Sequence, residues 1–283
     1  MLKRKTVGFI GAGSMAEAMI SGIVSANLLP PDQIIASNRS NNDRLTSLEK
    51  MYGIRGVTKS RLLMNELDIF VLAMKPKDIE VALEDLKTVV KPHQLILSVI
   101  AGVSTDRIEN GLPKGQPVIR VMPNTSSAIG ESATAISLGI NATSEHEQVT
   151  QKLLSAIGKV YVIEENQMDV FTGVAGSGPA YFYYLMEHME KTAKDAGLDS
   201  TVTREIVAQT ILGAAKMIMD GEETPSQLRK NVTSPNGTTA AGLAALRKNG
   251  GGSAISAAIK SATNRSKELC GENQNVTKDL ILT

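Results

Sequence analysis

The stretch VGFIGAGSMAEAMISGI, residues 7–23, decides the fold. It begins with a short apolar run, passes through two closely spaced glycines and continues with the apolar period of a helix. Gly11, Gly13 and Ala16 form a G-x-G-x-x-A pattern. In this pattern the first glycine allows a tight turn, the second clears room for a pyrophosphate, and the alanine lets helix and strand pack closely. The stretch therefore predicts a dinucleotide site.

The pattern of strand followed by helix continues along the first half of the chain. To about Val162, short β-branched runs alternate with helical patterns, which is typical of a parallel α/β sheet. We expect strands at 6–10, 34–37, 68–74, 95–99, 118–123, 132–138 and 159–163, and helices at 14–26, 41–52, 77–90, 104–110 and 145–157. In the first of these helices, the opening amide groups of Ser14 and Met15 are expected to attract phosphate, together with the helix dipole.

The second half differs, because strand-like runs disappear after about Glu164. Apolar-periodic segments follow at 165–175, 179–196, 201–219, 224–231, 238–248 and 252–270. We therefore predict two domains, 1–163 and 164–283, of which the second is all helix. Residues 204–219 are apolar nearly all round, so this helix lies either in the core or at a subunit interface, and the sequence leaves both open.

The end of the second expected strand selects the cofactor. An acidic residue there would hold the ribose 2′-hydroxyl of NAD and would repel a 2′-phosphate. The chain instead has Ser37, Asn38 and Arg39, which can donate hydrogen bonds to that phosphate, and Arg39 can add a charge-assisted pair. We predict NADPH as the cofactor, with NADH as a weaker substitute. The alternative is that Arg39 is only a solvated loop charge.

Other strand ends are expected to border the same site, because ligands of such sheets bind beyond the carboxyl ends of the strands. Lys75 could border the cofactor or simply stay solvated. The residues that we place on the cofactor side are Ala73, Lys75, Pro76, Ala101 and Asn124.

Composition indicates a small-molecule partner. Lys and Arg number 30 against 29 Asp and Glu, so the net charge of +1 supplies no field to recruit nucleic acid or an anionic membrane. No secretory signal is recognisable, and no run approaches the roughly 18 apolar residues of a membrane span. The single cysteine, Cys270, indicates a reducing compartment, and we expect a cytoplasmic protein.

The sequence offers few groups for metal or acid–base chemistry. No cluster of His, Cys, Asp or Glu has metal-ligand spacing, so we expect no metal. His93 and His146 are interpreted as surface residues, and His188 at most as a neighbour of a pocket. Cys270 is interpreted as an ordinary small residue on a late helix rather than as a catalytic thiol.

One stretch of the helical half looks selected for chemistry rather than packing: NVTSPNGTTAAGL, residues 231–243. Ser234 to Gly237 is a turn signal, and Thr238 or Thr239 is expected to be the N-cap of a helix at 238–248. Free N–H groups and hydroxyls at a helix start suit a carboxylate. Taken alone, these residues favour an ordinary capped helix start, with a carboxylate site as the alternative.

This segment resembles the signature of the pyrroline-5-carboxylate reductases, a Ser-Pro-Gly-Gly-(Thr or Ala)-Thr turn that enters a helix. The resemblance covers nearly the whole chain, through VGFIGAGSMAEAM, VLAMKP, VIRVMPNT, GVAGSGPAYFYYLME and LGAAKMI in the family's order. Asn236 departs from the signature, since glycine is commoner there. Asparagine tolerates left-handed backbone angles best after glycine, so the turn should survive.

The resemblance implies a Rossmann-type doubly wound parallel sheet followed by an all-α dimerisation domain. It also implies homodimers, which in many members assemble into decamers. The implied activity is the NADPH-dependent reduction of 1-pyrroline-5-carboxylate to L-proline, the last step of proline biosynthesis, by hydride transfer to the imine carbon.

The family's substrate loop corresponds here to Ser234, Gly237, Thr238 and Thr239, whose N–H groups and hydroxyls would hold the substrate carboxylate. Thr239 matches the position whose hydroxyl is thought to face the imine nitrogen. We assign it the catalytic role of orienting that nitrogen and relaying a proton. Glu222 matches an acidic residue near the same pocket, although it could equally be a solvated charge before a helix capped by Thr224.

Two other classes of protein fit parts of the sequence. A β-hydroxyacid dehydrogenase would carry a catalytic lysine a few residues after the Gly-Ser-Gly at 176–178, but Phe182 stands where that lysine would be. A non-catalytic NADP-binding module would fit only if residues 233–239 were purely structural.

Overall fold

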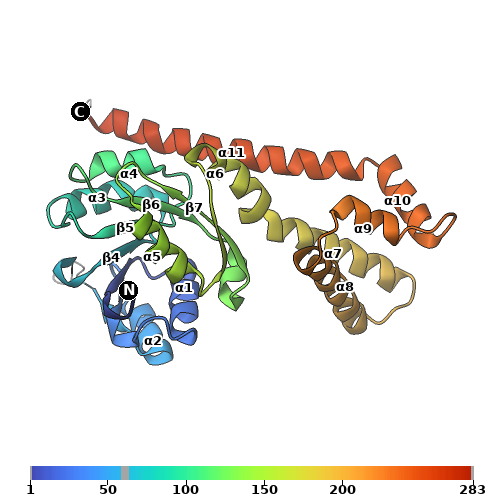
Figure 1. The fold of residues 1–283 in the computed structure, drawn as a ribbon, viewed down its shortest axis with the longest axis horizontal. Helices are drawn as coiled ribbons and strands as arrows, with labels where there is room; N and C mark the ends of the chain where they lie inside the picture. The colour runs from blue at the N-terminus through green and yellow to red at the C-terminus, as the bar shows by residue number, and fades with distance from the viewer. Residues whose placement is uncertain (1, 59–63, 282–283) are drawn as a thin grey trace. The chain divides into compact units, whose positions relative to one another are not determined.

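The computed structural model describes residues 2–58 and 64–281 (Figure 1). Two compact units make up the chain, Met1–Ser177 with Ser261–Thr283, and Gly178–Lys260. Strands among the described residues end at Val162, next to the domain boundary predicted at 163/164. The boundary between the compact units lies further along the chain, at Ser177/Gly178. The reason is that residues just after the last strand, and residues near the end of the chain, bond to the first unit.

Two contacts explain the later division. Arg120, which is buried in the sheet, pairs with Glu165 (Nη1 to Oε1, 2.6 Å). Ser266, near the end of the chain, donates its hydroxyl to Asp169 Oδ1 (2.6 Å). Both contacts tie helical residues beyond 163 to the first unit.

In the described residues, eight strands form one sheet in the order β3-β2-β1-β4-β5-β6-β7-β8. Their bounds are β1 (Val7–Ile10), β2 (Ile34–Ser37), β3 (Arg55–Val57), β4 (Ile69–Leu72), β5 (Leu95–Ser98), β6 (Val118–Met122), β7 (Ser132–Leu138) and β8 (Gly158–Val162). The order reverses beside β1, which lies between β2 and β4. This arrangement makes the carboxyl ends of β1, β2 and β4 the expected place for a ligand.

The predicted fold class is confirmed, but the sheet is not parallel throughout. All neighbouring strands pair in parallel except β6 and β7, which are antiparallel. The link between these two strands holds only the 3-10 turn η6 (Thr125–Ile129). A parallel connection needs a crossover of about a dozen or more residues, so this link allows only a reversal. The short strand β3 was not predicted; it is a three-residue edge strand of sequence Arg-Gly-Val.

Helices cover both faces of the sheet (Figure 1). One face carries α1 (Ser14–Ser25), α2 (Asn42–Tyr52) and α5 (Ser144–Leu154) over a core that includes Phe9 and Val71. The other carries α3 (Ile79–Lys87) and α4 (Thr105–Gly111) over Phe70 and Ile96. Adjacent residues of β4 thus enter opposite cores, as the period of a strand requires.

The remaining elements are helical, as predicted. The segment expected as one helix at 165–175 is the 3-10 turn η7 (Glu165–Gln167), the short helix α6 (Met168–Phe171) and a π-helical turn, η8 (Thr172–Gly176). The long helices follow as α7 (Gly178–Asp195), α8 (Ser200–Asp220), α9 (Pro225–Asn231), α10 (Thr238–Lys248) and α11 (Gly251–Ile281). No helix among the described residues is long and apolar enough to cross a membrane.

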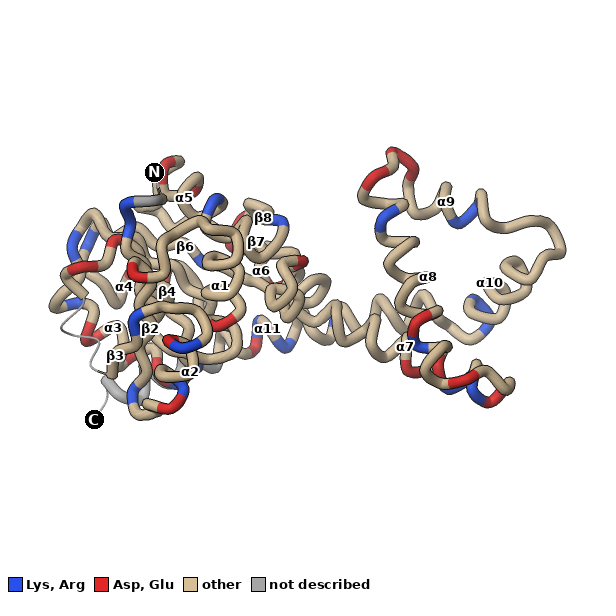
Figure 2. The backbone as a smooth tube through the Cα atoms, turned by 90° about the horizontal axis from the view of Figure 1, so that it is seen from below, with Lys and Arg blue, Asp and Glu red and all other residues tan. Residues whose placement is uncertain are grey.

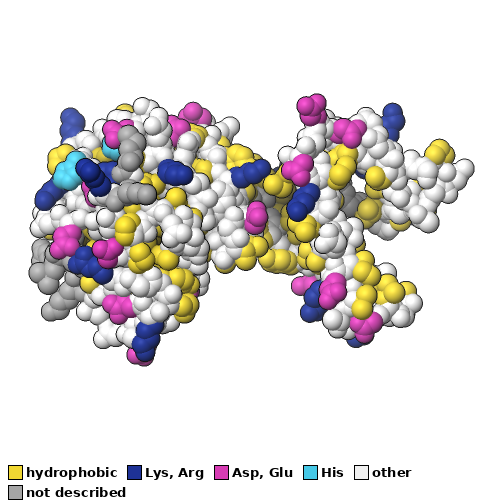
Figure 3. Space-filling model, turned by 60° about the horizontal axis from the view of Figure 1, so that its bottom comes forward, with side chains coloured by type: hydrophobic (Ala, Val, Ile, Leu, Met, Phe, Trp, Pro, Cys, Tyr) yellow, Lys and Arg dark blue, Asp and Glu magenta, His cyan; other side chains and the backbone are white. Residues whose placement is uncertain are grey.

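Burial is sparse in the second unit. In Gly178–Lys260, all of which the structure describes, only Gly178, Thr203 and Val207 are buried. Helix α8, whose all-round apolar sequence left a core or an interface position open, has large side chains at the surface of this chain: Ile206 is 50% exposed and Met217 is 58% exposed. Apolar side chains gather on the surface of this unit (Figure 3). Acidic and basic residues are interspersed along the backbone of both units (Figure 2), as the balanced composition suggests.

Replacement of Gly22 tests how tightly α1 packs against the link between α5 and β8. A Cβ atom at this position would lie 2.7 Å from the carbonyl oxygen of Ala156 and 2.8 Å from a methyl carbon of Ile157. We expect Gly22→Ala to lower the free energy of unfolding by about 1–3 kcal/mol, measured by urea denaturation.

Gly271→Ala in α11 is the matched control, because a Cβ there meets no atom within 4 Å. This variant should leave stability unchanged or raise it by about 0.5–1 kcal/mol. Equal effects of the two substitutions would contradict the close packing of α1.

Candidate functional site

The turn between β1 and α1 shows why both of its glycines are needed. Gly11 has a φ of 109°, and a Cβ atom there would lie 2.6 Å from the carbonyl oxygen of Ala73. Gly13 is the N-cap of α1, and a Cβ there would meet no protein atom within 4 Å. Gly11 is therefore required by the fold, whereas Gly13 opens a space in front of the helix. Ala16, the third residue of the pattern, is fully buried against the sheet.

Arg44 of α2 holds this turn in place. Its Nε donates to the carbonyl oxygen of Ala12 (2.9 Å), and its Nη2 pairs with Glu17 Oε2 (2.6 Å). Glu17 lies in the first turn of α1, where a free carboxylate would repel an incoming phosphate. The guanidinium offsets that charge, which leaves the start of α1 suited to an anion.

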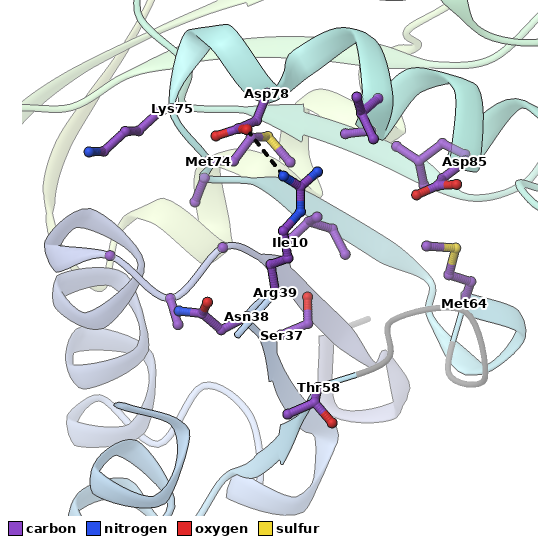
Figure 4. Close-up of a pocket in the computed structure, with 17 residues that line it drawn as sticks. Ile10, Ser37, Asn38, Arg39, Thr58, Met64, Met74, Lys75, Asp78 and Asp85 are labelled. Carbon is purple, nitrogen blue, oxygen red and sulfur yellow. Dashed lines mark ion pairs between the residues drawn. The ribbon is translucent and has the colours of Figure 1, made fainter. Parts of the chain in front are cut away.

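A cavity of about 650 Å³ opens at the carboxyl ends of β1, β2 and β4 (Figure 4). The predicted cofactor residues that line it are Gly11, Gly13, Ser37, Asn38, Arg39, Ala73 and Lys75. Its size is within the range of small-molecule and cofactor sites. The strand ends, the glycine turn and the cavity thus come together where sheet topology places a dinucleotide.

The three residues at the end of β2 differ in what they can offer a ligand. Ser37 is buried, and its hydroxyl donates to the carbonyl oxygen of Phe9 (3.2 Å), so it would have to exchange this bond to donate to a phosphate. Asn38 Oδ1 accepts from the amides of Ser40 and Asn41 (3.4 Å each), which leaves its amide nitrogen for a ligand. The Arg39 side chain is 73% exposed and its Nη1 lies 3.7 Å from Asp78 Oδ1.

The remaining predicted cofactor residues do not line the cavity, but three of them lie within two positions of a residue that does. Ser14 and Met15 begin α1, and Pro76 begins the 3-10 turn η5 (Pro76–Asp78) beside Lys75. Ala101 and Asn124 are not among the residues that line the cavity.

Asn124 has a structural partner on each side. Its Nδ2 donates to the carbonyl oxygen of Ala175 (3.1 Å), and its Oδ1 accepts from the amide of Ser126 (3.0 Å). The side chain therefore ties the end of β6 to the π-helical turn η8.

The loop of the second unit that the sequence predicts to bind substrate is a tight turn before α10. Asn236 has a φ of 58°, in the left-handed region that glycine or asparagine adopts most easily. The N-cap of α10 is Gly237, which has extended angles and no side-chain cap, and α10 begins at Thr238. The predicted threonine N-cap is therefore wrong: the turn at Asn236 ends one residue earlier than expected, and both threonines already have helical backbone angles.

This helix start still presents donors. The first intrahelical bond runs from the amide of Ala241 to the carbonyl oxygen of Gly237 (3.2 Å), so the amides of Thr238 and Thr239 precede the helical ladder. Within the described residues, neither threonine hydroxyl has a hydrogen-bond partner. A Cβ at Gly237 would lie 2.5 Å from Ser234 Oγ, which places the serine hydroxyl directly over the turn. The loop thus offers amide and hydroxyl donors to an anion.

The acidic pair before α9 has one bonded member. Glu223 Oε1 accepts from Asn231 Nδ2 (2.7 Å), while Glu222 is exposed and has no ion pair among the described residues. Thr224 accepts from the amide of Gln227 (3.2 Å), so its predicted role as the N-cap of α9 is confirmed.

Two known families match the two halves of the chain. The family described as pyrroline-5-carboxylate reductase dimerisation matches residues 165–269, and the one described as NADP oxidoreductase, coenzyme F420-dependent, matches residues 6–102. Pyrroline-5-carboxylate reductase 1 of Bacillus subtilis is 60% identical over 94% of this chain and 90% of its own length. The protein of the same name from Bacillus spizizenii is 58% identical over 98% of this chain and 93% of its own. The chain belongs to the pyrroline-5-carboxylate reductase family.

Solved structures of the family agree with the fold. A pyrroline-5-carboxylate reductase from Coxiella burnetii has a TM-score of 0.88 at 31% identity and covers 94% of this chain and 99% of that one. A pyrroline carboxylate reductase from Plasmodium falciparum, solved with NADP bound, has a TM-score of 0.86 at 26% identity and covers 95% of this chain and 100% of that one.

Candidates for acid–base chemistry outside the reductase signature have other roles. His146 accepts from the Thr143 amide (Nδ1, 3.1 Å) in a capping box at the start of α5, and burial lowers the pKa of its ring. His93 is exposed, and His188 stacks edge-on against Tyr184 on α7. Burial raises the pKa of the Cys270 thiol, which makes it a poor nucleophile. Among the described residues, no three His, Cys, Asp or Glu side chains gather as a metal site would require.

Sequence reasoning missed the far wall of the cavity, to which α3 and the segment just before it contribute most of the residues. The missed lining residues are Thr58, Met64, Met74, Asp78, Val81, Ala82, Asp85 and Leu86, besides Ile10 and Ala12 of the glycine turn. Val81 carried a usable signal in the sequence, because it is an apolar residue on the side of this helix opposite Ile79 and Leu83. In the structure it is 48% exposed. Met64 and Thr58 carried none, since only folding brings them there.

Gly13 gives a direct test of the dinucleotide site. Because a Cβ here meets no protein atom within 4 Å and the backbone is extended, we expect Gly13→Ala to keep the melting temperature of the parent protein. The added methyl group would occupy the space of a pyrophosphate, so NADP affinity should fall about tenfold or more, measured by calorimetric titration. Unchanged affinity would contradict a pyrophosphate at this turn.

Proposed function

We propose that the chain catalyses the NADPH-dependent reduction of 1-pyrroline-5-carboxylate to L-proline, the last step of proline biosynthesis. The observation that carries this proposal is the 60% identity to a pyrroline-5-carboxylate reductase over 94% of the chain. The enzyme is an oxidoreductase that acts on a C=N bond. Such a reaction requires one site for the cofactor and one for the substrate carboxylate. The cavity at the strand ends and the start of α10 are the candidates for these two sites.

The residues of the cavity fit NADPH. The turn at Gly11 cannot take a side chain, Gly13 leaves space before α1, and the amides of Ser14 and Met15 face that space at the helix start. Asn38, Arg39 and Lys75 would hold the 2′-phosphate on the adenosine ribose and the groups next to it. NADH is the weaker alternative because it lacks this 2′-phosphate. When bound, the cofactor supplies a hydride to the C5 carbon of the imine.

The substrate carboxylate binds at the start of α10 in this proposal. The amides of Thr238 and Thr239 lie before the first helical hydrogen bond, and the hydroxyls of Ser234 and Thr238 add further donors. Charge-assisted bonds from such donors are stronger than neutral ones, so a small carboxylate can be held without a cationic side chain. Glu222 is exposed just before α9, and in this proposal it lies near the same pocket and contacts the substrate.

Thr239 is the proposed catalytic residue. Its hydroxyl orients the imine nitrogen and donates a proton to it, which water then replaces. With the hydride on the carbon, this one proton on the nitrogen completes the reduction of the C=N bond to a secondary amine. The hydroxyl is too weak an acid to lower the barrier much by proton transfer. Orientation of the two bound partners therefore supplies most of the rate increase, which for well-placed reactants reaches several kcal/mol.

The activity is tested by following the loss of nicotinamide absorbance. NADPH should be oxidised when 1-pyrroline-5-carboxylate is added, whereas a 3-oxo acid should not oxidise NADPH and a 3-hydroxy acid should not reduce NADP+. A reaction only with the 3-oxo or 3-hydroxy acid, or with none of these substrates, would overturn the proposal.

Two substitutions in the same assay test the role of Thr239. Thr239→Ser keeps the hydroxyl and should retain most of the turnover, whereas Thr239→Ala should lower kcat/KM by about tenfold to a hundredfold, as expected when a hydrogen bond to the reacting group is lost. If Thr239→Ala kept both turnover and substrate affinity, the assignment would be wrong.

The functional domains in this proposal are 1–163 for NADP binding, and 164–283 for substrate binding and dimerisation. The chain assembles as a homodimer through its helical domain, and a decamer is the proposed higher assembly. It acts in the cytoplasm. The support for the dimer is the match to the dimerisation family at 165–269 and the exposed apolar side chains of α8. Side chains such as Ile206 and Met217, half exposed in a single chain, need a partner to leave water.

A charge on α8 tests this assembly. We expect Ile206→Glu to raise the dissociation constant of the dimer by at least about tenfold, because a carboxylate would have to be buried in an apolar contact. Light scattering on a sizing column over a dilution series gives the mass. Ile140→Glu, at an isoleucine of the first unit that is 89% exposed, is the control and should remain dimeric. An Ile206→Glu protein with an unchanged dissociation constant would contradict a place for Ile206 in the interface.

A further inference from the structure

Asp78 places a negative charge in the part of the cavity that faces Arg39. It ends the 3-10 turn η5 after β4 and lines the cavity together with Arg39 from the end of β2. Its Oδ1 lies 3.7 Å from Arg39 Nη1, and the two side chains point toward each other across the cavity (Figure 4). The pair joins the two strand ends between which an adenosine ribose would lie.

The carboxylate of Asp78 makes no hydrogen bond among the described residues; apart from its favourable charge at the start of α3, its contact is with Arg39. It is the N-cap of α3, yet its side chain makes no capping hydrogen bond, and the contact with Lys75 is made by the backbone amide of Asp78 (3.0 Å). An asparagine could take its place without losing a hydrogen bond. What the carboxylate adds is charge beside Arg39.

That charge acts against a 2′-phosphate in two ways. A phosphate monoester carries about −1.5 to −2 charges at neutral pH, so a carboxylate close to the same guanidinium repels it. The carboxylate also competes for Arg39, which must loosen its pair with Asp78 to bind the phosphate. Both effects lower the affinity for a 2′-phosphate and leave a free 2′-hydroxyl unaffected.

The same carboxylate suits a cofactor without the phosphate. In dinucleotide sites an acidic residue that accepts from the ribose 2′-hydroxyl selects NAD, and it usually follows the second strand. Here that position carries Asn38 and Arg39, while an acidic residue approaches from the end of β4. Cation and acid face each other, so the cavity holds one group suited to each form of the cofactor.

We infer that Asp78 is a specificity-determining residue that limits the preference for NADPH over NADH by holding Arg39 in an ion pair. This inference rests on the proposed use of a 2′-phosphorylated cofactor at this cavity. Asp78 weakens the grip on the phosphate and keeps the site usable by NADH.

The test measures binding rather than turnover. The full-length protein is titrated at low salt with adenosine 2′,5′-bisphosphate and with adenosine 5′-monophosphate, and the ratio of the two dissociation constants is the readout. Asp78→Asn should tighten the bisphosphate about two- to fivefold, the size expected of an exposed ion pair, and leave the monophosphate unchanged or weaker. The ratio of kcat/KM for NADPH to that for NADH should rise by the same factor.

Two further variants separate the pair from a general effect of charge. Glu84→Gln removes a carboxylate from α3 that does not line the cavity, so it should leave the ratio unchanged. In an Arg39→Ala background the gain from Asp78→Asn should shrink, because the cation that Asp78 holds is gone. Equal ratios in the wild type and Asp78→Asn, an equal gain from Glu84→Gln, or a full gain without Arg39 would each overturn the inference.

The proposed function fails on a different result. If the wild type does not prefer the bisphosphate to the monophosphate, the assignment of NADPH is wrong. If the wild type binds the bisphosphate more tightly but does not reduce 1-pyrroline-5-carboxylate, the substrate is wrong, and the effect of Asp78 can still be judged from binding alone.

Discussion

The contact between the β1–α1 turn and the end of β4 is the constraint on which the cofactor cavity depends. The amide of Gly11 donates to the carbonyl oxygen of Ser37 (3.0 Å), and the amide of Ala73 donates to that of Ile10 (2.9 Å). These bonds hold three strand ends in one row. A Cβ at Gly11 would collide with Ala73, so any other residue would separate them and widen the cavity at its floor.

The features that were predicted correctly depend on local spacing. The glycine pattern, the alternation of strands and helices, and the apolar period of the second half each require only neighbouring residues, and all appear in the structure. The antiparallel β7 and the short strand β3 depend instead on what lies beside them in the sheet. The length of the link after Met122 contained the information about β7, but the strand pattern at 132–138 is the same in either direction.

The candidate site was predictable where backbone position decides it and less so where side-chain partners do. Seven of the predicted cofactor residues line the cavity, because the ends of parallel strands meet at one edge. Ser37 and Asn124 were predicted to lie on the cofactor side. In the structure the side chain of each donates to a backbone carbonyl, a partner that the sequence does not reveal. Most of the far wall, with Asp78 and Val81, comes from α3 and the turn before it, whose orientation follows only from packing on the sheet.

The sparse burial of Gly178–Lys260 links folding to the amount of protein present. A unit in which three residues are buried removes too little apolar surface from water to offset the conformational entropy of its helices. With the partner proposed here, the missing burial is gained on association, and the law of mass action then applies to the folded state. Dilution would therefore lower the fraction of chains whose helical unit is folded. A newly made chain would complete its helical half only after meeting a second one, so the rate of synthesis in the cell would help to set the yield of active enzyme.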